Sequence, residues 1–353
     1  MEYYTIIIHT STDICNKVKT YPYISYTNTF ICIPGDSTTT LHHGYLVGES
    51  TVLPIVRDTC RAIYQVLYKD YLQTPSSTED WLKVAKGFHN NWNFPHTLGA
   101  IDGKHIRIKC PRNSGSLFYN YKKFYSIVLL AVADADYNFL YVDCGAEGRA
   151  SDSTLWTQSQ FAQDIEREDN PLGIPEPALF PGHQGTLNYF FVGDDAFALG
   201  EHMMKPFPSK ELTAAQRIFN YRLSRARRVV ENTFGILSTR FRILRREIDM
   251  EPEGARDVVL ACVALHNFIK AVSPKNYMAR PSTDWEDKDY RVHRGLWRRE
   301  VELEPMDKTH TKKNHSIFVK EMRQKLMYWC LTKEGECKWQ YELVLKSLFI
   351  DDE

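Results

Sequence analysis

Three acidic residues stand at positions where a carboxylate is unfavourable by itself. Asp102 interrupts an apolar strand pattern, Asp194 ends another, and Glu231 lies beside the apolar face of a helical pattern. A buried carboxylate is costly unless it is paired, hydrogen-bonded or bound to a metal. Carboxylate oxygens are ligands that suit Mg²⁺ or Mn²⁺. Two such ions can hold the attacking and leaving oxygens of a phosphoryl transfer, so metal-dependent phosphoryl transfer is the first hypothesis.

Each acid also has a purely structural interpretation. Asp102 could accept hydrogen bonds from backbone N–H groups in a turn or bulge, and Asp194 could cap the turn after its strand. Glu231 could pair with Arg227 and Arg228, which precede it on the same helix face. Taken one at a time these interpretations are favoured, because three acids alone are a weak motif.

The segment around Glu231 is strongly basic. Residues 217–246 contain nine Arg and one acid, although the whole chain has a formal net charge of zero. Salt-bridged surface helices usually mix both signs, and the planar guanidinium binds phosphate in bidentate fashion. A basic helix of this length favours a polymeric substrate over the small substrates of a metal phosphoesterase. The predicted DNA contacts are Arg222, Arg225, Arg227, Arg228, Arg240 and Arg242.

The composition is that of a folded globular protein. The chain has 353 residues, 43% of them hydrophobic and 25% charged, which is enough to bury a core and excludes wholesale disorder. The apolar run from Ile127 to Ala133 is far too short to span a membrane, and no signal peptide follows Met1. The eight Cys show no zinc-ligand spacing. They predict reduced thiols and a nuclear or cytosolic location.

The order of apolar patterns predicts an α/β fold. We expect three strands first, linked by a short loop and a tight turn and therefore antiparallel, then a helix, a fourth strand and further helices. Ser50 is the expected N-cap of an early helix, Ser151 or Asp152 that of a later one, and Thr213 begins a capping box. The expected strands lie at 96–108, 127–132, 139–143 and 189–195. The expected helices lie at about 50–67, 151–165, 213–241, 255–271 and 317–329, and a further helix begins at about 75.

Several motifs in one order resemble a known family. They are Gly99-Ala-Ile-Asp102-Gly-Lys-His-Ile, Tyr121-Lys-Lys-Phe-Tyr, Gly148-Arg-Ala-Ser-Asp152, Val192-Gly-Asp194-Asp-Ala-Phe, Val230-Glu231-Asn-Thr-Phe-Gly and Leu265-His-Asn-Phe-Ile. Across residues 48–271 the chain resembles the PIF/Harbinger superfamily of DDE transposases, and especially Harbinger transposase-derived nucleases.

The resemblance implies an RNase H-like mixed sheet flanked by helices. It assigns the metal-binding and catalytic roles to Asp102, Asp194 and Glu231, with Mg²⁺ or Mn²⁺ as cofactor. Asp194 is preferred over Asp195 because the family pattern is Gly-Asp followed by two small or polar residues and an aromatic. Asp152 also matches a family acid, but capping its helix explains it. Lys104 and His105 are candidate contacts to DNA or merely line the sheet.

The resemblance also implies a domain order and partners. Residues 1–44 are poorly patterned, 45–95 form a small helical region like a helix-turn-helix, 96–273 form the nuclease domain, and 274–353 form a polar linker or arm with a final helix.

The implied partners are DNA and a Myb/SANT-like protein, with an oligomer allowed and the nucleus as location. The expected function is a metal-dependent DDE nuclease or transposase. The alternative is a catalytically inactive, domesticated transposase that binds DNA or acts as a scaffold.

Overall fold

A computed structural model describes residues 38–46, 48–180, 185–208, 211–278, 283–288, 290–299, 303–306 and 316–345. The central sheet has the strand order β3-β2-β1-β6-β7, and a short strand, β10, pairs with β1 off this path. Its members are β1 (Thr97–Arg107), β2 (Ser126–Ala133), β3 (Phe139–Glu147), β6 (Phe190–Val192), β7 (Met203–Met204) and β10 (Glu304–Pro305). Strands β1, β2 and β3 are antiparallel, whereas β6 runs parallel to β1. The expected mixed α/β sheet is therefore confirmed.

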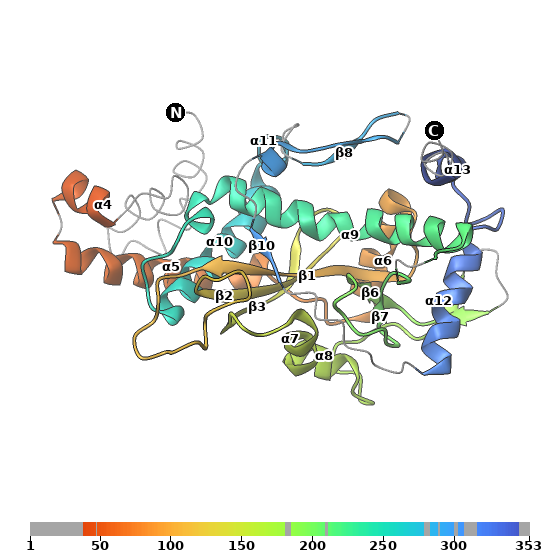
Figure 1. The fold of residues 1–353 in the computed structure, drawn as a ribbon, viewed down its shortest axis with the longest axis horizontal. Coiled ribbons are helices and arrows are strands. Elements are labelled where there is room, and N and C mark those ends of the chain that lie inside the picture. Colours follow the sequence, from red (N-terminus) through yellow and green to blue (C-terminus); the bar gives the residue numbers. More distant parts are fainter. Residues whose placement is uncertain are drawn as a thin grey trace.

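Helices cover both faces of this sheet (Figure 1). The face that carries Ala100 and Ile106 packs against α5 (Glu49–Tyr71), α9 (Ala214–Arg240) and α10 (Pro252–Val272). The face that carries Ile101 packs against α7 (Asp152–Gln158), α8 (Gln160–Ile165) and the first half of α6 (Thr78–Trp92). Strand β2 is buried along its whole length because it lies between these two layers.

The remaining elements are short and lie around this core. They are α4 (Thr38–Tyr45), β4 (Ala178–Leu179) paired with β5 (Thr186–Leu187), η1 (Arg242–Arg245), α11 (Pro274–Tyr277), β8 (Trp285–Glu286) paired with β9 (Val292–His293), η2 (Leu296–Arg299), α12 (Ile317–Trp329) and α13 (Lys338–Leu345). No helix in the described part of the chain is long and apolar enough to cross a membrane.

Local sequence signals located most helices but not all their caps. The Thr213–Gln216 capping box at the start of α9 is present as expected. The expected cap of α5 was wrong, because that helix begins at Glu49, after Gly48, and Ser50 lies within it. Asp152 is not a cap either: Ser151 accepts the backbone N–H of Thr154 and Asp152 is the first helical residue.

The segment expected to be a polar linker is partly packed onto the domain. Strand β10 pairs with β1 at Lys104 and His105, and the β8–β9 hairpin with η2 lies along the outer side of α9 (Figure 1). Trp297 of η2 is 3% exposed because its ring packs over Gly235 of α9. We call residues 283–299 the strap. The division into four regions stays a prediction.

Gly235→Ala tests the strap contact. A Cβ at position 235 would lie 2.3 Å from an atom of the Trp297 ring, so the strap would have to move away. Overpacking of this kind typically lowers the free energy of unfolding by about 1–3 kcal/mol. Gly44→Ala is the matched control, because nothing lies within 4 Å of a Cβ there and Gly44 is helical. Chemical denaturation of both variants measures the difference. Equal stability of the two would mean that Trp297 does not pack on α9.

Candidate active site

Asp102 lies on the face of β1 that meets α9. Alternate side chains of a strand share a face, so Asp102 and Lys104 point the same way, and the Lys104 ammonium lies 5.8 Å from the Phe234 ring centre on α9. Both side chains are buried, and Nζ of Lys104 is 3.0 Å from Oδ2 of Asp102. The acid that interrupts the apolar strand is thus an ion-paired carboxylate beneath a helix.

Asp194 follows the neighbouring strand on the same part of the sheet. Val192, the last residue of β6, is in register with Ala100 of β1, so the chain places residue 194 beside residue 102. Asp194 is 8% exposed, and its Oδ1 accepts the backbone N–H of Ala196 at 2.9 Å. This hydrogen bond fixes the turn that carries the carboxylate.

Glu231 reaches this region from α9 and is held by two arginines. Oε1 pairs with Arg227, one helical turn earlier, and Oε2 lies 3.0 Å from Nη2 of Arg298 in the strap. Burial would raise the pKa of Glu231, but the charges of Arg227, Lys104 and Arg298 outweigh it and lower the pKa. Glu231 is therefore a carboxylate anion in this site.

The charges of all three acids act on the guanidinium of Arg227. Burial would lower the pKa of Arg227, but the charges of Glu231, Asp102 and Asp194 together raise it. Burial would likewise lower the pKa of Lys104, yet Asp102 and Glu231 raise it. Because Coulomb interactions fall with distance, all three carboxylates lie in the neighbourhood of Arg227 although three separate elements carry them.

The oxygens of Asp102, Asp194 and Glu231 suit a hard divalent cation. In this conformation, however, basic side chains contact two of these carboxylates. Three carboxylates supply oxygens of the kind that Mg²⁺ and Mn²⁺ bind. Within the described ranges, however, no three His, Cys, Asp or Glu side chains are grouped closely enough to hold a metal ion. Lys104, Arg227 and Arg298 contact Asp102 and Glu231 instead. A bound ion would require these side chains to move.

Asp195 and Asp152, the two other acids in the family motifs, have different surroundings from Asp102, Asp194 and Glu231. Asp195 Oδ1 is 3.5 Å from the ammonium of Lys205, and its charge also acts on Arg323 of α12. Asp152 faces the opposite side of β1, where a Cβ on Gly103 would meet its carboxylate. These positions favour Asp194 over Asp195 for a role with Asp102 and Glu231.

The arginines predicted to contact DNA have mainly internal partners. Arg222 is 1% exposed; it donates to the carbonyl oxygens of Asn93 and Gly335 and packs over the Trp329 ring. Arg240 donates to the carbonyl oxygen of Tyr277 at 2.7 Å. Arg242, in contrast, is exposed.

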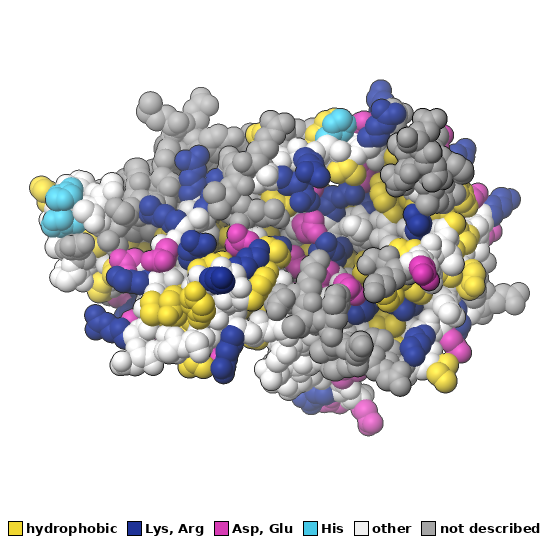
Figure 2. Space-filling model, in the orientation of Figure 1, with side chains coloured by type: hydrophobic (Ala, Val, Ile, Leu, Met, Phe, Trp, Pro, Cys, Tyr) yellow, Lys and Arg dark blue, Asp and Glu magenta, His cyan; other side chains and the backbone are white. Residues whose placement is uncertain are grey.

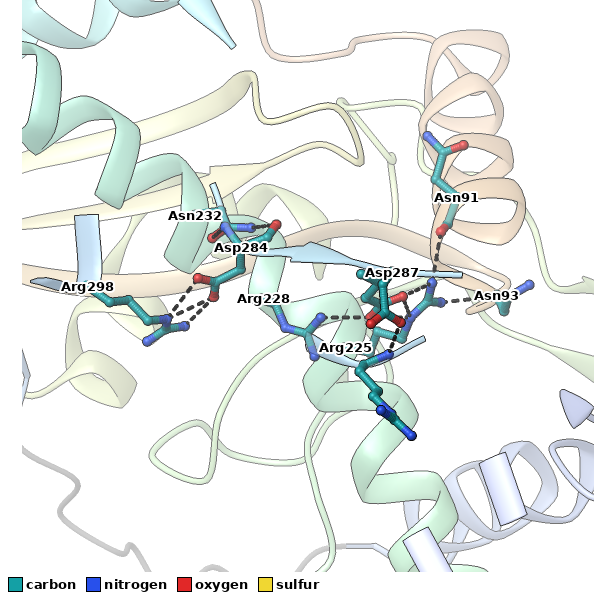
Figure 3. A network of polar contacts seen from close by, with 10 residues as sticks. Asn91, Asn93, Arg225, Arg228, Asn232, Asp284, Asp287 and Arg298 are labelled. Carbon is teal, nitrogen blue, oxygen red and sulfur yellow. Dashed lines mark hydrogen bonds and ion pairs between the residues drawn. The ribbon is translucent and has the colours of Figure 1, made fainter. Parts of the chain in front are cut away.

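Two further arginines of α9 bind the strap (Figure 3). Arg225 is 6% exposed and pairs with Glu286 and Asn93, and Arg228 pairs with Glu286 at 2.8 Å. The DNA-binding role of the six arginines stays a prediction, but burial makes Arg222 and Arg225 unsuitable as phosphate contacts.

Sequence reasoning missed the strap side chains that bind Glu231 and the arginines of α9. Asp284 binds Arg298 at 2.7 Å (Figure 3), and Arg298 in turn binds Glu231. The local excess of Arg over acid in α9 was the available signal: it indicated that the missing acids come either from a ligand or from a distant part of the chain.

Comparison with known proteins identifies the domain. Residues 101–267, which include all three acids, match the family model described as DDE superfamily endonuclease. This part of the chain is therefore similar to DDE superfamily endonucleases. It is 26% identical over 263 residues to "Protein ALP1-like" of Arabidopsis thaliana, which covers 73% of this chain and 62% of that protein.

Animal relatives match a shorter part of the chain. This chain is 25% identical over 201 residues to the human protein named "Putative nuclease HARBI1", and the match covers 56% of this chain and 53% of that protein. The Bos taurus protein of the same name is 27% identical over 201 residues, with the same coverage. The matches thus span about half to three fifths of these relatives. No solved structure matches. The resemblance to Harbinger transposase-derived nucleases is confirmed by this homology.

Arg222→Ala tests the internal role of the buried guanidinium. The substitution leaves carbonyl oxygens of Asn93 and Gly335 without their donors and should lower the free energy of unfolding by about 2–3 kcal/mol. Arg242→Ala, on exposed Arg242 just beyond α9, should change it by less than about 0.5 kcal/mol. Urea denaturation of both variants measures the contrast. A fully stable Arg222→Ala protein would contradict the internal role.

Proposed function

We propose that this chain is a metal-dependent nuclease or transposase that cuts DNA phosphodiester bonds by in-line attack of water or a 3′-hydroxyl. The observation that carries the proposal is the arrangement of Asp102, Asp194 and Glu231 around Arg227 inside a DDE endonuclease domain. Nuclear location, a Myb/SANT-like partner and oligomer formation belong to the same proposal.

Each acid has a separate part in the proposed site. Asp102, on the rigid strand β1, and Asp194, on the turn after β6, would hold divalent ions from the sheet side, and Glu231 would close the site from α9. When bound, Mg²⁺ or Mn²⁺ would supply Lewis-acid stabilisation of the attacking and leaving oxygens. The chain itself orients the carboxylates: the Ala196 N–H fixes Asp194, and the strap holds Glu231 through Arg298.

Lys104 and Arg227 have a second use in this proposal. With ions on the three carboxylates, these cations would be free to turn toward the phosphate that is being cleaved. An Arg or Lys aimed at a transferring phosphoryl group stabilises the charge that develops there. Both residues are therefore candidates for substrate contacts as well as for pairing with the acids.

Asp194→Asn and Asp195→Asn separate the two adjacent acids. The first substitution would keep the shape of the Asp194 side chain but supply no anionic ligand, so cleavage of plasmid DNA with Mg²⁺ should fall by at least about 10²–10³-fold, the effect of losing one strong electrostatic contact. Asp195→Asn should stay near wild-type activity because Asp195 faces Lys205. Cleavage that survives in the first variant and disappears in the second would exchange the two roles. A wild-type protein that never cuts DNA would leave the scaffold alternative.

Arg227→Gln tests metal binding without an activity assay. Removing the shared cation leaves three carboxylates repelling one another, so the metal-free variant should melt below wild type. A divalent ion restores the missing charge and stabilises the folded form by mass action. Mg²⁺ should therefore raise the melting temperature of Arg227→Gln more than that of wild type. Arg242→Gln is the control, on an exposed arginine. An equal effect of Mg²⁺ on all three proteins would argue against a metal at this site.

A further inference from the structure

The loop between β1 and β2 is a second basic region of the chain. Residues 107–125, which we call the basic loop, contain five Lys or Arg and no acid. All five are exposed: Arg107, Lys109, Arg112, Lys122 and Lys123. Figure 2 shows Lys and Arg side chains beside hydrophobic side chains over this loop, at the lower left of the molecule.

Most of this positive charge has no partner within the described residues. Lys109 pairs with Asp249 and Lys122 with Glu304, whereas no described acid forms an ion pair with Arg107, Arg112 or Lys123. This is the reverse of α9, where the strap supplies acids to the arginines. The guanidinium of Arg107 packs over the Phe124 ring at 4.3 Å, which leaves its charge at the surface.

Buried contacts fix the shape of the basic loop. The side chain of Asn120 is 3% exposed; its amide donates to Ser126 Oγ at 3.0 Å, and its Oδ1 accepts the backbone N–H of Lys122 at 3.0 Å. The turn after Asn120 therefore presents Tyr121, Lys122 and Lys123 outward as one unit. Tyr121 is 47% exposed, and Tyr119 close by is 41% exposed. Aromatic side chains between cations are typical of nucleic-acid binding surfaces.

The loop is joined through β10 to the strand that carries Asp102. The Tyr121 hydroxyl donates to the carbonyl oxygen of Pro305 at 2.9 Å, and Pro305 of β10 is in register with Lys104. Lys104 in turn pairs with Asp102. Along β1, Arg107 lies about 17 Å beyond Asp102 at 3.3–3.4 Å per residue, which is about five base-pair steps of a DNA duplex. A duplex cut at Asp102 therefore needs only about five further base pairs to reach the loop.

Residues 242–248 add two exposed arginines to the surface around the basic loop. The backbone N–H of Lys109 donates to the carbonyl oxygen of Ile248 at 3.1 Å, so residues 242–248 run beside the base of the loop. This segment carries Arg242 and Arg246, both exposed. Of the six arginines predicted to contact DNA, Arg242 is thus the one that belongs to this region.

We propose that the basic loop binds the phosphate backbone of DNA and leads the duplex to Asp102. The inference rests on the proposed nuclease function and supplies the DNA path that the buried arginines of α9 do not. Arg112 and Lys123 make its main charge contacts because both are exposed and neither forms an ion pair with a described residue.

The test is DNA binding by Arg112→Gln/Lys123→Gln, measured by fluorescence anisotropy of a labelled duplex in EDTA over a salt series. Each lost phosphate contact lowers the slope of log affinity against log salt by about 0.9. The double variant should therefore bind about tenfold or more weakly near 0.1 M salt, with a slope smaller by up to about 1.8 units. Lys325→Gln/Lys333→Gln is the charge-matched control: both lysines are exposed, on α12 and the turn after it, at the opposite end of the molecule (Figure 1). The control should bind like wild type.

The outcomes separate this inference from the proposed function. If wild type binds DNA and the loop variant has the same affinity and slope as the control, the inference is overturned and the nuclease proposal stands. If binding depends on the loop but wild type cuts no DNA with Mg²⁺, the nuclease proposal is overturned and the loop remains a DNA-binding surface. A wild-type protein that binds no DNA overturns both.

Discussion

The packing of three carboxylates, two of them buried and one half-buried, between the sheet and α9 is the constraint on which much of the described structure depends. Buried anions that repel one another require cations at close range. Arg227 and Lys104 meet this requirement from α9 and from β1 itself. The charge of Asp102 on β1 acts on Arg227, and the charge of Glu231 on α9 acts on Lys104, so charge balance as well as apolar packing joins helix to strand here. The site carries positive groups that an incoming ion would have to displace.

The strap is best understood as the completion of this charge balance. It adds Arg298 to Glu231 and supplies Glu286 to Arg225 and Arg228 of α9, while Asp284 pairs with Arg298 within the strap. Arg298 pairs with both Asp284 of the strap and Glu231 of α9. The position of the strap is therefore coupled to that of the Glu231 carboxylate. A segment that looks like a polar linker in the sequence therefore positions a residue of the candidate site. This arrangement leaves the basic loop as a large positive region whose charge remains available at the surface.

The sequence by itself determined most of the long helices and strands and the order of the acids. Local patterns were sufficient for this purpose: the apolar run of β2, the capping box of α9 and the strand that precedes Asp194 each depend on neighbouring residues only. The motif order was enough to indicate the endonuclease family. Local rules were weaker at helix starts, because a cap depends on the backbone geometry of one residue, and this is why Ser50 and Asp152 were assigned wrongly.

Only the tertiary structure decided what each charged side chain contacts. Arg225 and Glu286 are 61 residues apart in the sequence, so no local charge count could show that Glu286 of the strap pairs with two arginines of the basic helix. The same applies to Asp152, which the fold places across β1 from Asp102. It applies again to Arg112 and Lys123, whose lack of described acid partners depends on which segments pack beside the loop. Charge pairing acts through space over a few ångströms, and distance along the chain does not set distance in the fold.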